Sequence, residues 1–332
     1  MDLFAFISLF GGLALFLYGI SLMGGGLERA ALERVRPVLG RLTGSPLRGV
    51  LLGAAVTAAI QSSSAATVIV VGLVGAGAVT LRQAIGVIMG ANIGTTVTAH
   101  LLRFGEAGAE TVPLLRLCSP STLAPASILL GAVLFLGAKK SRPKALGQLF
   151  LGFGILFTGM LQMEAAVAPL RDDPAFLRLF RRTEDPLLGV LAGAGVTALI
   201  QSSSASVGIL QAVSWAAAVP ILLGQNIGTC ATPLLASVGG TRGAKQAALA
   251  HLLLNLLGSA VFLAAVYGTG WFSRAPFWER PITKAGIARF HTFFNLAVTA
   301  MFLPFIGTLE RAVCRLVPPQ AHQKPCRGPT LS

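Results

Sequence analysis

The sequence predicts an all-α integral membrane protein built from two related halves. Three observations support this prediction: the composition, the uninterrupted apolar runs and a repeated polar motif. The chain has 332 residues, of which 54% are hydrophobic and 11% are charged, and its mean hydropathy is +0.75. A soluble domain carries about 25% charged residues, so this chain lacks the polar surface to cover itself in water.

Two apolar runs are long enough to span a bilayer. Phe4–Met23 and Leu117–Ala138 contain no charged residue across 20 and 22 positions, and a helix of about 20 residues crosses roughly 30 Å of hydrocarbon. Unbroken runs favour helices over a β-barrel. The start of the chain, MDLFAF, has no Lys or Arg, so we interpret the first run as a retained helix rather than a signal peptide.

The formal net charge of +14 comes largely from basic residues that lie between the apolar spans. This pattern is typical of cytoplasmic loops that face anionic lipid. We therefore expect a multi-pass protein of the cell inner (plasma) membrane, with no nucleic-acid partner and no organic cofactor. The two main basic groups are Arg29, Arg34, Arg36, Arg41 and Arg48, and Lys139, Lys140, Arg142 and Lys144.

The chain contains an internal duplication. GVLLGAAVTAAIQSSSA (Gly49–Ala65) recurs as GVLAGAGVTALIQSSSA (Gly189–Ala205), 140 residues later, and GANIGTT (Gly90–Thr96) recurs as GQNIGTC (Gly224–Cys230), 134 residues later. The interval between the two words is therefore six residues shorter in the second half. We expect repeat 1 at 1–138, repeat 2 at 145–268, a final transmembrane helix at 285–316 and a disordered cytoplasmic tail at 317–332.

Duplicated helical units are typical of secondary transporters, and the two units often have inverted topology. The loops do not decide whether these repeats are inverted. Gly25–Arg48 carries five basic residues and Arg171–Asp185 carries four, so both look cytoplasmic by the positive-inside rule. We expect inversion by analogy with transporters.

Each QSSS word places a Gln and three hydroxyls inside an apolar stretch. A broken helix or re-entrant hairpin would bury the irregular backbone within the protein, and Ser is a favoured N-cap for a new half-helix. Such a helix start offers free N–H groups to an anion, while Gln and Ser oxygens can coordinate sodium. Small polar residues also join membrane helices, but two copies at matched positions favour an ion site.

The G-x-N-I-G-T word has two interpretations. Asn92 and Asn226 place amides at membrane depth, with Thr95 and Thr229 three residues further on, and they could contribute to a polar site. The alternative is a glycine-rich packing seam with a helix break.

A third pattern, H-x-x-x-N, occurs at His251/Asn255 and His291/Asn295. We favour interhelical hydrogen bonding over proton shuttling for these pairs. The carboxylate nearest to a span interior is Glu164, toward a helix end. The scarcity of carboxylates in the spans argues against proton drive, and for metal-cation coupling or an uncoupled route.

Six sequence motifs, in this order along the chain, resemble those of the type II sodium–phosphate cotransporter family, especially its bacterial members. They are the two QSSS words, GANIGTT, GQNIGTC, AHLLLN (Ala250–Asn255) and FHTFFN (Phe290–Asn295). The resemblance extends from Leu9 to about Phe305.

This resemblance implies sodium-driven import of inorganic phosphate by alternating access between two inverted QSSS hairpins. The expected partners are inorganic phosphate, sodium ions and the lipid bilayer, with Na+ as the coupling ion and the only metal; a homodimer is an open alternative to a monomer. The phosphate-binding residues implied are Gln61, Ser62, Ser63, Ser64, Gln201, Ser202, Ser203 and Ser204. The sodium-binding residues implied are Gln61, Ser64, Asn92, Thr95, Gln201, Ser204, Asn226 and Thr229, with Thr57 and Thr197 as lesser candidates.

The chain departs from the family pattern in three places. Repeat 2 is six residues shorter between Ser204 and Asn226, which puts symmetric closure in doubt, and Cys230 replaces the hydroxyl of Thr96. Many bacterial relatives continue into a PhoU-like domain, which we expect this chain to lack.

Other functions stay open at this stage. The helix start and hydroxyls of the QSSS motifs do not specify which anion they bind. A transporter or channel for another small anion, or a non-transporting phosphate sensor, is therefore an alternative. A membrane serine enzyme would need an activating base and an orienting acid. It is disfavoured, because no G-x-S-x-G motif occurs and SSS repeated at matched positions suits binding better than one-sided catalysis.

Overall fold

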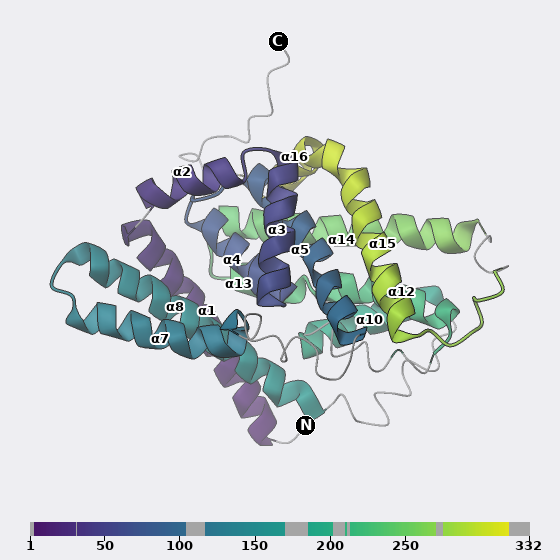
Figure 1. Ribbon diagram of the computed structural model, residues 1–332, viewed down its shortest axis with the longest axis horizontal. Helices are drawn as coiled ribbons and strands as arrows, with labels where there is room; N and C mark the ends of the chain where they lie inside the picture. The colour runs from purple at the N-terminus through teal and green to yellow at the C-terminus, as the bar shows by residue number, and fades with distance from the viewer. Residues whose placement is uncertain are drawn as a thin grey trace, which may run out of the picture.

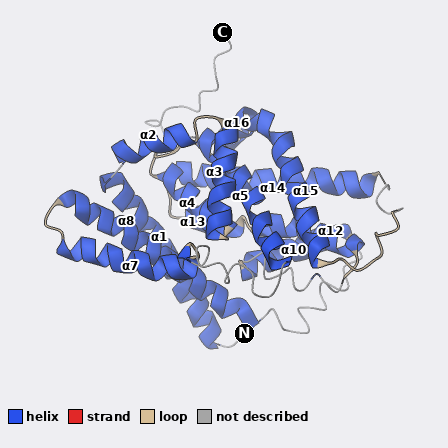
Figure 2. Cartoon of the chain, viewed as in Figure 1, coloured by secondary structure: helices blue, strands red, loops and turns tan. Residues whose placement is uncertain are grey.

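The computed structural model describes residues 3–30, 32–103, 117–169, 185–201, 210, 213–269 and 275–318. Within these ranges the chain is helical, with one isolated β-bridge between Ser214 and Pro281 and no strand (Figure 2). Six of these helices are long and apolar enough to cross a membrane. The prediction of an all-α membrane protein is confirmed.

The helices follow the chain in the order shown in Figure 1. Repeat 1 contributes α1 (Leu3–Ala30), α2 (Leu32–Leu42), α3 (Pro46–Ile60), α4 (Ser63–Gly75), α5 (Leu81–Arg103) and α7 (Pro120–Gly137). Repeat 2 contributes α8 (Ser141–Val167), α10 (Pro186–Ile200), α12 (Trp215–Gly228), α13 (Ala231–Ser237) and α14 (Arg242–Gly268). The chain then forms α15 (Lys284–Phe302), the 3-10 turn η4 (Leu303–Phe305) and α16 (Ile306–Leu316). Residues 319–332, most of the expected tail, lie outside the described part.

Large apolar side chains point outward from the helices. Phe4, Leu136 and Leu191 are 78%, 82% and 67% exposed, and they lie on α1, α7 and α10. A soluble protein does not leave such surfaces uncovered, whereas the hydrocarbon of a bilayer covers them. The chain is therefore a multi-pass membrane protein, and a bacterial inner membrane is its expected location.

Glycines fit α3 closely against α5 in a parallel pair. Gly53 lies against the carbonyl of Val87, and Gly90 lies against that of Val50, so the two backbones approach as only small residues allow. In repeat 2, α10 and α12 pair in the same register, with Gly193 against Ile221 and Gly224 against Val190. The glycines at four-residue spacing are therefore packing seams in both halves.

This parallel pairing requires the chain to return between α3 and α5. Gly86, near the start of α5, lies against Pro46 at the start of α3, and Gly94 lies against Thr57 near its end. The segment 61–80, which contains α4, must therefore carry the chain back along α3, so α3 and α4 form a helical hairpin that turns at Gln61–Ser62. The predicted helix break at the first QSSS word is confirmed.

The six-residue difference between the repeats falls in this return segment. Thr197 packs against Gly228 as Thr57 packs against Gly94, so both helix pairs keep one register despite the shorter interval. The return in repeat 2 is made by 201–214, of which 202–209, 211 and 212 lie outside the described residues. The shortening therefore leaves the packing of the α10–α12 pair unchanged.

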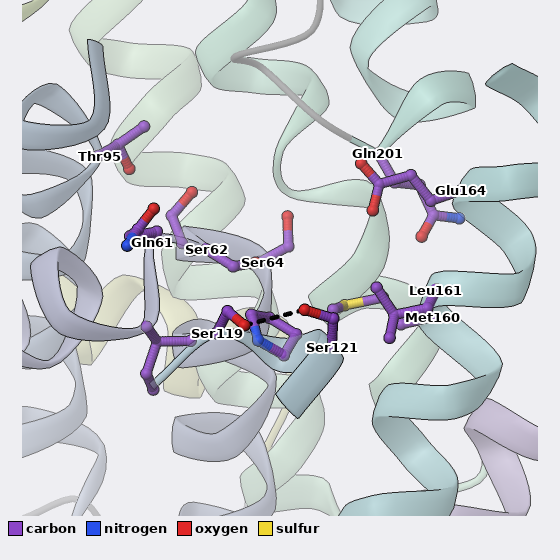
Figure 3. A pocket seen from close by; sticks show the side chains of 13 residues that line it. Gln61, Ser62, Ser64, Thr95, Ser119, Ser121, Met160, Leu161, Glu164 and Gln201 are labelled. Carbon is purple, nitrogen blue, oxygen red and sulfur yellow. Dashed lines mark hydrogen bonds between the residues drawn. The ribbon is translucent and has the colours of Figure 1, made fainter. Parts of the chain in front are cut away.

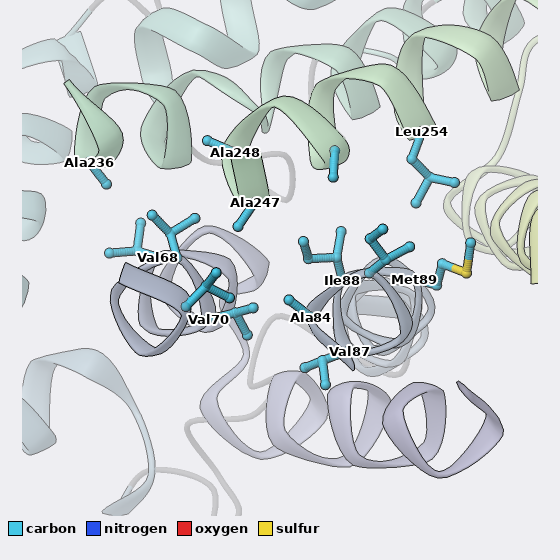
Figure 4. Packing of buried hydrophobic residues seen from close by; sticks show 14 of the residues in the cluster. Val68, Val70, Ala84, Val87, Ile88, Met89, Ala236, Ala247, Ala248 and Leu254 are labelled. Atoms are coloured by element: carbon cyan, nitrogen blue, oxygen red, sulfur yellow. The ribbon is translucent and has the colours of Figure 1, made fainter. Parts of the chain in front are cut away.

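The helix α4 is buried in the centre of the molecule. Val68 and Val70 on α4 lie beneath α13 and α14, with Ala84 of α5 beside them (Figure 4). A helix that is apolar on all sides belongs in a core. Its first residues, Ser63 and Ser64, are buried as well, so the packing of α4 fixes the position of the hairpin turn.

The first helices of the two repeats, α1 and α8, cross in an antiparallel pair. Gly12 lies against Gly159, and Gly19 lies against Gly152. At the 140-residue offset, Gly12 corresponds to Gly152 and Gly19 corresponds to Gly159, so each contact maps onto the other. This reciprocity is the pattern of an isologous contact about a two-fold axis.

Substitution of one seam glycine should destabilise the protein, whereas a glycine two residues away should tolerate the same change. A Cβ on Gly193 would collide with the backbone of Ile221, but a Cβ on Gly195 would meet nothing within 4 Å. We expect Gly193→Ala to reduce stability by about 1–3 kcal/mol, and Gly195→Ala to leave it unchanged or raise it by about 0.5–1 kcal/mol. Thermal unfolding in detergent measures both, and equal midpoints would contradict this packing.

Candidate functional site

The Gln of each QSSS motif has the same backbone conformation. Gln61 (φ 60°) and Gln201 (φ 59°) are the non-glycine residues with positive φ in the described ranges. Each donates its backbone N–H to the Thr carbonyl one helical turn earlier, Thr57 or Thr197, at 2.7 Å. The left-handed conformation costs an L-residue about 1–2 kcal/mol, and glycine would adopt it freely. The Gln side chain is therefore the reason to retain a strained residue here.

The start of α4 directs polar groups toward this turn. Ser62 is the N-cap, and its hydroxyl accepts a hydrogen bond from the N–H of Ala65 at 3.2 Å. The hydroxyl of Thr67 donates to the carbonyls of Ser63 and Ser64, at 2.8 and 3.1 Å. The uncapped N–H groups and the positive end of the helix dipole therefore point at the turn, where an anion is favoured.

A pocket of about 230 Å³ opens at this turn, and we name it the QSSS pocket. It is smaller than the pockets of about 300–1,000 Å³ that hold organic ligands, so it suits small ions. Figure 3 shows Gln61 and Thr95 on one side of it, with Gln201 and Glu164 on the other. The lining residues are Ile60, Gln61, Ser62, Ser63, Ser64, Thr95, Ser119, Pro120, Ser121, Met160, Leu161, Glu164 and Gln201.

A second helix also begins at the pocket. Ser119 occupies the N-cap position of α7 with Pro120 next to it, and the hydroxyls of Ser119 and Ser121 lie 2.9 Å apart. Neither Ser119 nor Ser121 is among the site residues that the sequence predicts. A Ser followed by Pro is a helix-start signal that could have located the α7 start, but not its position beside the first QSSS word.

The pocket contains no basic group in its described lining. Its residues are apolar or uncharged polar, apart from the carboxylate of Glu164. The described lining therefore offers an anion helix starts, hydroxyls and amides. Unpaired charge is costly away from water, so a cation beside the anion would lower that cost.

The G-x-N-I-G-T words meet in a buried polar network instead of lining this pocket. The Asn92 side chain donates to the Asn255 side chain at 2.6 Å, and Asn255 donates to the carbonyl of Asn226 at 3.1 Å and to the sulfur of Cys230 at 3.2 Å. The Asn226 amide lies 3.3 Å from a ring nitrogen of His291.

The interhelical role expected of the H-x-x-x-N pattern is thus confirmed for Asn255 and His291. Asn295 instead bonds within its own helix, to the carbonyl of His291. Neither ring nitrogen of the buried His251 has a hydrogen-bond partner among the described residues.

Thr57 and Thr197 occupy equivalent positions in the two repeats and share an unusual environment. Both hydroxyls are buried and have no hydrogen-bond partner in the described part of the chain. Each lies one turn before its Gln and against a glycine of the paired helix. The two lesser candidates are therefore equivalent in their surroundings, but they do not line the QSSS pocket.

The structure brings only part of the expected set to one place. The pocket collects the Gln and Ser residues of the first word, together with Thr95 and Gln201. Asn92, Asn226 and Thr229 do not line it, and the hydroxyl of Thr229 donates to the carbonyl of Asn226 at 2.6 Å. Ser202, Ser203 and Ser204 lie outside the described residues.

Comparison with protein families gives a match over most of the chain. A family model described as Na+/Pi-cotransporter matches residues 15–165 and 170–275. The chain belongs to the Na+/Pi-cotransporter family. Members of this family are transporters and not enzymes, as predicted.

Two bacterial relatives match this chain over nearly all of its length. The uncharacterized protein YqeW of Bacillus subtilis is 31% identical over 315 residues, which cover 91% of this chain and 95% of YqeW. The putative inorganic phosphate export protein YjbB of Escherichia coli K12 is 29% identical over 314 residues, covering 92% of this chain and 54% of YjbB. The chain thus spans about half the length of YjbB.

A short segment also matches a human protein. Sodium-dependent phosphate transport protein 2B is 45% identical over 64 residues, which cover 19% of this chain and 9% of that protein. No solved structure matches the cotransporter.

The strained Gln residues give a prediction that separates function from folding. Gln61→Gly removes both the side chain and the cost of the left-handed conformation. We expect its unfolding temperature to equal or exceed that of the wild type, while phosphate uptake falls about 100-fold or more, in the range found when one oxyanion-binding group is removed. A loss of both stability and uptake would show that Gln61 serves the fold.

Proposed function

We propose that this cotransporter is a sodium-coupled symporter that imports inorganic phosphate by alternating access, with the anion and Na+ bound between two QSSS hairpins. The observation that carries the proposal is one small pocket lined by both Gln turns and by the start of α4, without a basic side chain in its described lining. Such a pocket favours an anion together with cations over an anion alone.

The QSSS pocket and one group of basic residues lie at opposite ends of α8. The α1–α8 contacts place Gly26 against Ala145, so the end of α1 and the start of α8 share one end of the molecule. Basic residues gather at that end, and fewer described ones lie at the opposite end. The first group includes Arg29, Lys139, Lys140, Arg142, Lys144, Arg242 and Lys245, and the second consists of Arg280, Lys284 and Arg289. Arg171, Arg178, Arg181 and Arg182 follow α8 in the sequence, so the positive-inside rule does not by itself orient the molecule. We propose that the QSSS pocket, beside Glu164 near the end of α8, faces outward.

A second cavity supports the alternation between two sides. Three α8 residues of the QSSS pocket correspond, at the 140-residue offset, to three α1 residues that line a cavity of about 390 Å³ near the basic end. The two sets are Met160, Leu161 and Glu164, and Ile20, Ser21 and Gly24. Together with the reciprocal α1–α8 contacts, this correspondence favours inverted repeats, in which the second cavity is the cytoplasmic vestibule.

Export of phosphate is the second candidate function, because the relative YjbB is named as a putative phosphate export protein. A symporter runs in the direction that its ion gradients set, so the direction is testable in the same system. Transport of another small anion also remains an alternative to phosphate.

Proteoliposomes with an imposed sodium gradient test the proposal. We expect labelled phosphate to accumulate when sodium is high outside, to flow outward when the gradient is reversed, and to stay near background for Gln61→Ala combined with Gln201→Ala. Uptake that ignores sodium would refute the coupling. Preference for sulfate over phosphate would show that the substrate is another anion. A steady current without accumulation would indicate a channel.

Cysteine labelling tests the alternation. Gly24→Cys places a thiol in the second cavity, where an added Cβ meets nothing within 4 Å, and Ser121→Cys places one in the QSSS pocket. In a Cys118→Ser background, we expect sodium with phosphate to change the two labelling rates in opposite directions. Parallel changes at both positions would contradict alternating access through these cavities.

A further inference from the structure

A cavity of about 440 Å³, which we name the aromatic cavity, lies between α12, α14, α15 and the turn 275–281. Its volume is within the range of about 300–1,000 Å³ that is typical of sites for organic ligands. The ten described residues that line it are all apolar, so the cavity suits an apolar ligand and not an ion. Six of the ten are aromatic: Trp215, Phe262, Phe277, Trp278, Phe290 and Phe293.

Hydrogen bonds and ring contacts hold the walls of the aromatic cavity in place. The N–H of Trp215 donates to the carbonyl of Arg280 at 3.1 Å, and the N–H of Ala216 donates to the carbonyl of Trp278 at 3.1 Å. These two bonds fasten the turn to the start of α12. The hydroxyl of Tyr267 donates to the carbonyl of Ala216 at 2.6 Å, and the Tyr267 ring lies 5.7 Å from that of Trp278. The cavity is therefore largely pre-formed, as ligand sites usually are.

The aromatic cavity opens onto the surface that the bilayer covers. Val261 on α14 and Phe293 on α15 line it, and both are exposed. Exposed apolar side chains on the spans of a membrane protein face hydrocarbon. An apolar cavity offers water no hydrogen-bond partner, whereas the acyl chains of the surrounding lipid can fill it. The lining and its position therefore favour a lipid chain as the occupant.

Basic side chains flank this cavity near the membrane surface. The helix α14 has 27 residues, enough to cross the bilayer, so the turn that follows it lies at the opposite surface from the start of α14. Tryptophan in the cavity walls is typical of such an interface. The described residues 275–290 carry three exposed basic side chains, Arg280, Lys284 and Arg289, and one exposed carboxylate, Glu279. The excess of positive charge favours an anionic headgroup over a zwitterionic one.

We propose that the aromatic cavity binds one acyl chain of an anionic phospholipid, whose headgroup phosphate lies against Arg280 and Lys284. The aromatic walls hold the hydrocarbon chain, and the two cations supply the preference for an anionic lipid. A chain bound there contacts α12, α14 and α15 together, so it stabilises their packing. The site shares no lining residue with the QSSS pocket, and it does not depend on which ion is transported.

Quenching of tryptophan fluorescence by brominated lipids tests this site. The chain contains three Trp residues, and Trp271→Phe leaves Trp215 and Trp278, which both line the cavity, as reporters. The full chain is placed in phosphatidylcholine vesicles that contain rising fractions of dibrominated phosphatidylglycerol or dibrominated phosphatidylcholine. We expect the anionic lipid to reach half-maximal quenching at a mole fraction about fivefold or more lower than the zwitterionic lipid.

Two substitutions on α14 distinguish the cavity from the lipid-facing surface around it. Ala265 lines the cavity, so Ala265→Phe would fill part of its volume. Ala264, the exposed neighbour, is not among the lining residues. We expect Ala265→Phe to remove the quenching at low mole fractions of the anionic lipid, and Ala264→Phe to retain it.

A matched pair of charge substitutions tests the headgroup contact, and it does not depend on whether Ala265→Phe folds. Lys284→Gln should reduce the preference for phosphatidylglycerol about fivefold. Lys245→Gln, which alters an exposed residue near the other end of α14, should leave the preference unchanged.

Thermal unfolding in detergent gives a second readout of the same site. A lipid that binds only the folded state raises the unfolding temperature, so phosphatidylglycerol should stabilise the wild type and Ala264→Phe more than phosphatidylcholine does. The inference is overturned if the two lipids quench and stabilise the wild type equally. It is also overturned if folded Ala265→Phe responds as the wild type does, or if Lys284→Gln keeps the full preference for the anionic lipid.

Discussion

The cost of placing ionic charge in a pocket whose described lining has no basic side chain is the constraint on which the rest depends. The described lining of the QSSS pocket offers hydroxyls, amides, helix starts and Glu164, but no Lys or Arg. Helix dipoles and N–H groups favour an anion by only modest free energies, whereas an uncompensated charge away from water is much more costly. Under the proposed function, cations beside the phosphate would offset this cost, and sodium coupling would follow from the composition of the described lining.

The fold supports this pocket by fixing a strained turn. The hairpin reverses at Gln61 because α3 and α5 are parallel and joined through glycines, and α4 is held by its buried apolar surface. Packing on this scale compensates for two Gln residues in the left-handed conformation. The parallel helix pair and the left-handed Gln recur in repeat 2, at α10–α12 and Gln201.

The sequence predicts the membrane class, the duplication and the hairpin break from strong local signals. Apolar length identifies the spans, and the repeated word locates the turn at Gln61. Local signals cannot show which residues distant in the sequence come into contact. This is why some residues that the sequence assigned to the site do not line the pocket, and why others that line it were not identified. Asn92 and Asn226 share a word with Thr95 and Thr229, but tertiary packing directs both Asn side chains to Asn255 and His291. Ser119 and Glu164 reach the pocket from α7 and α8, helices without a repeated polar motif.

Phosphate binding to the purified protein, measured calorimetrically in sodium chloride and in choline chloride at equal ionic strength, tests the central claim most directly. The account predicts binding in sodium and, in choline, an affinity lower by at least about 100-fold, or about 2.7 kcal/mol. Equal affinity in the two salts would mean that the pocket compensates the anion's charge by itself, and would contradict the account.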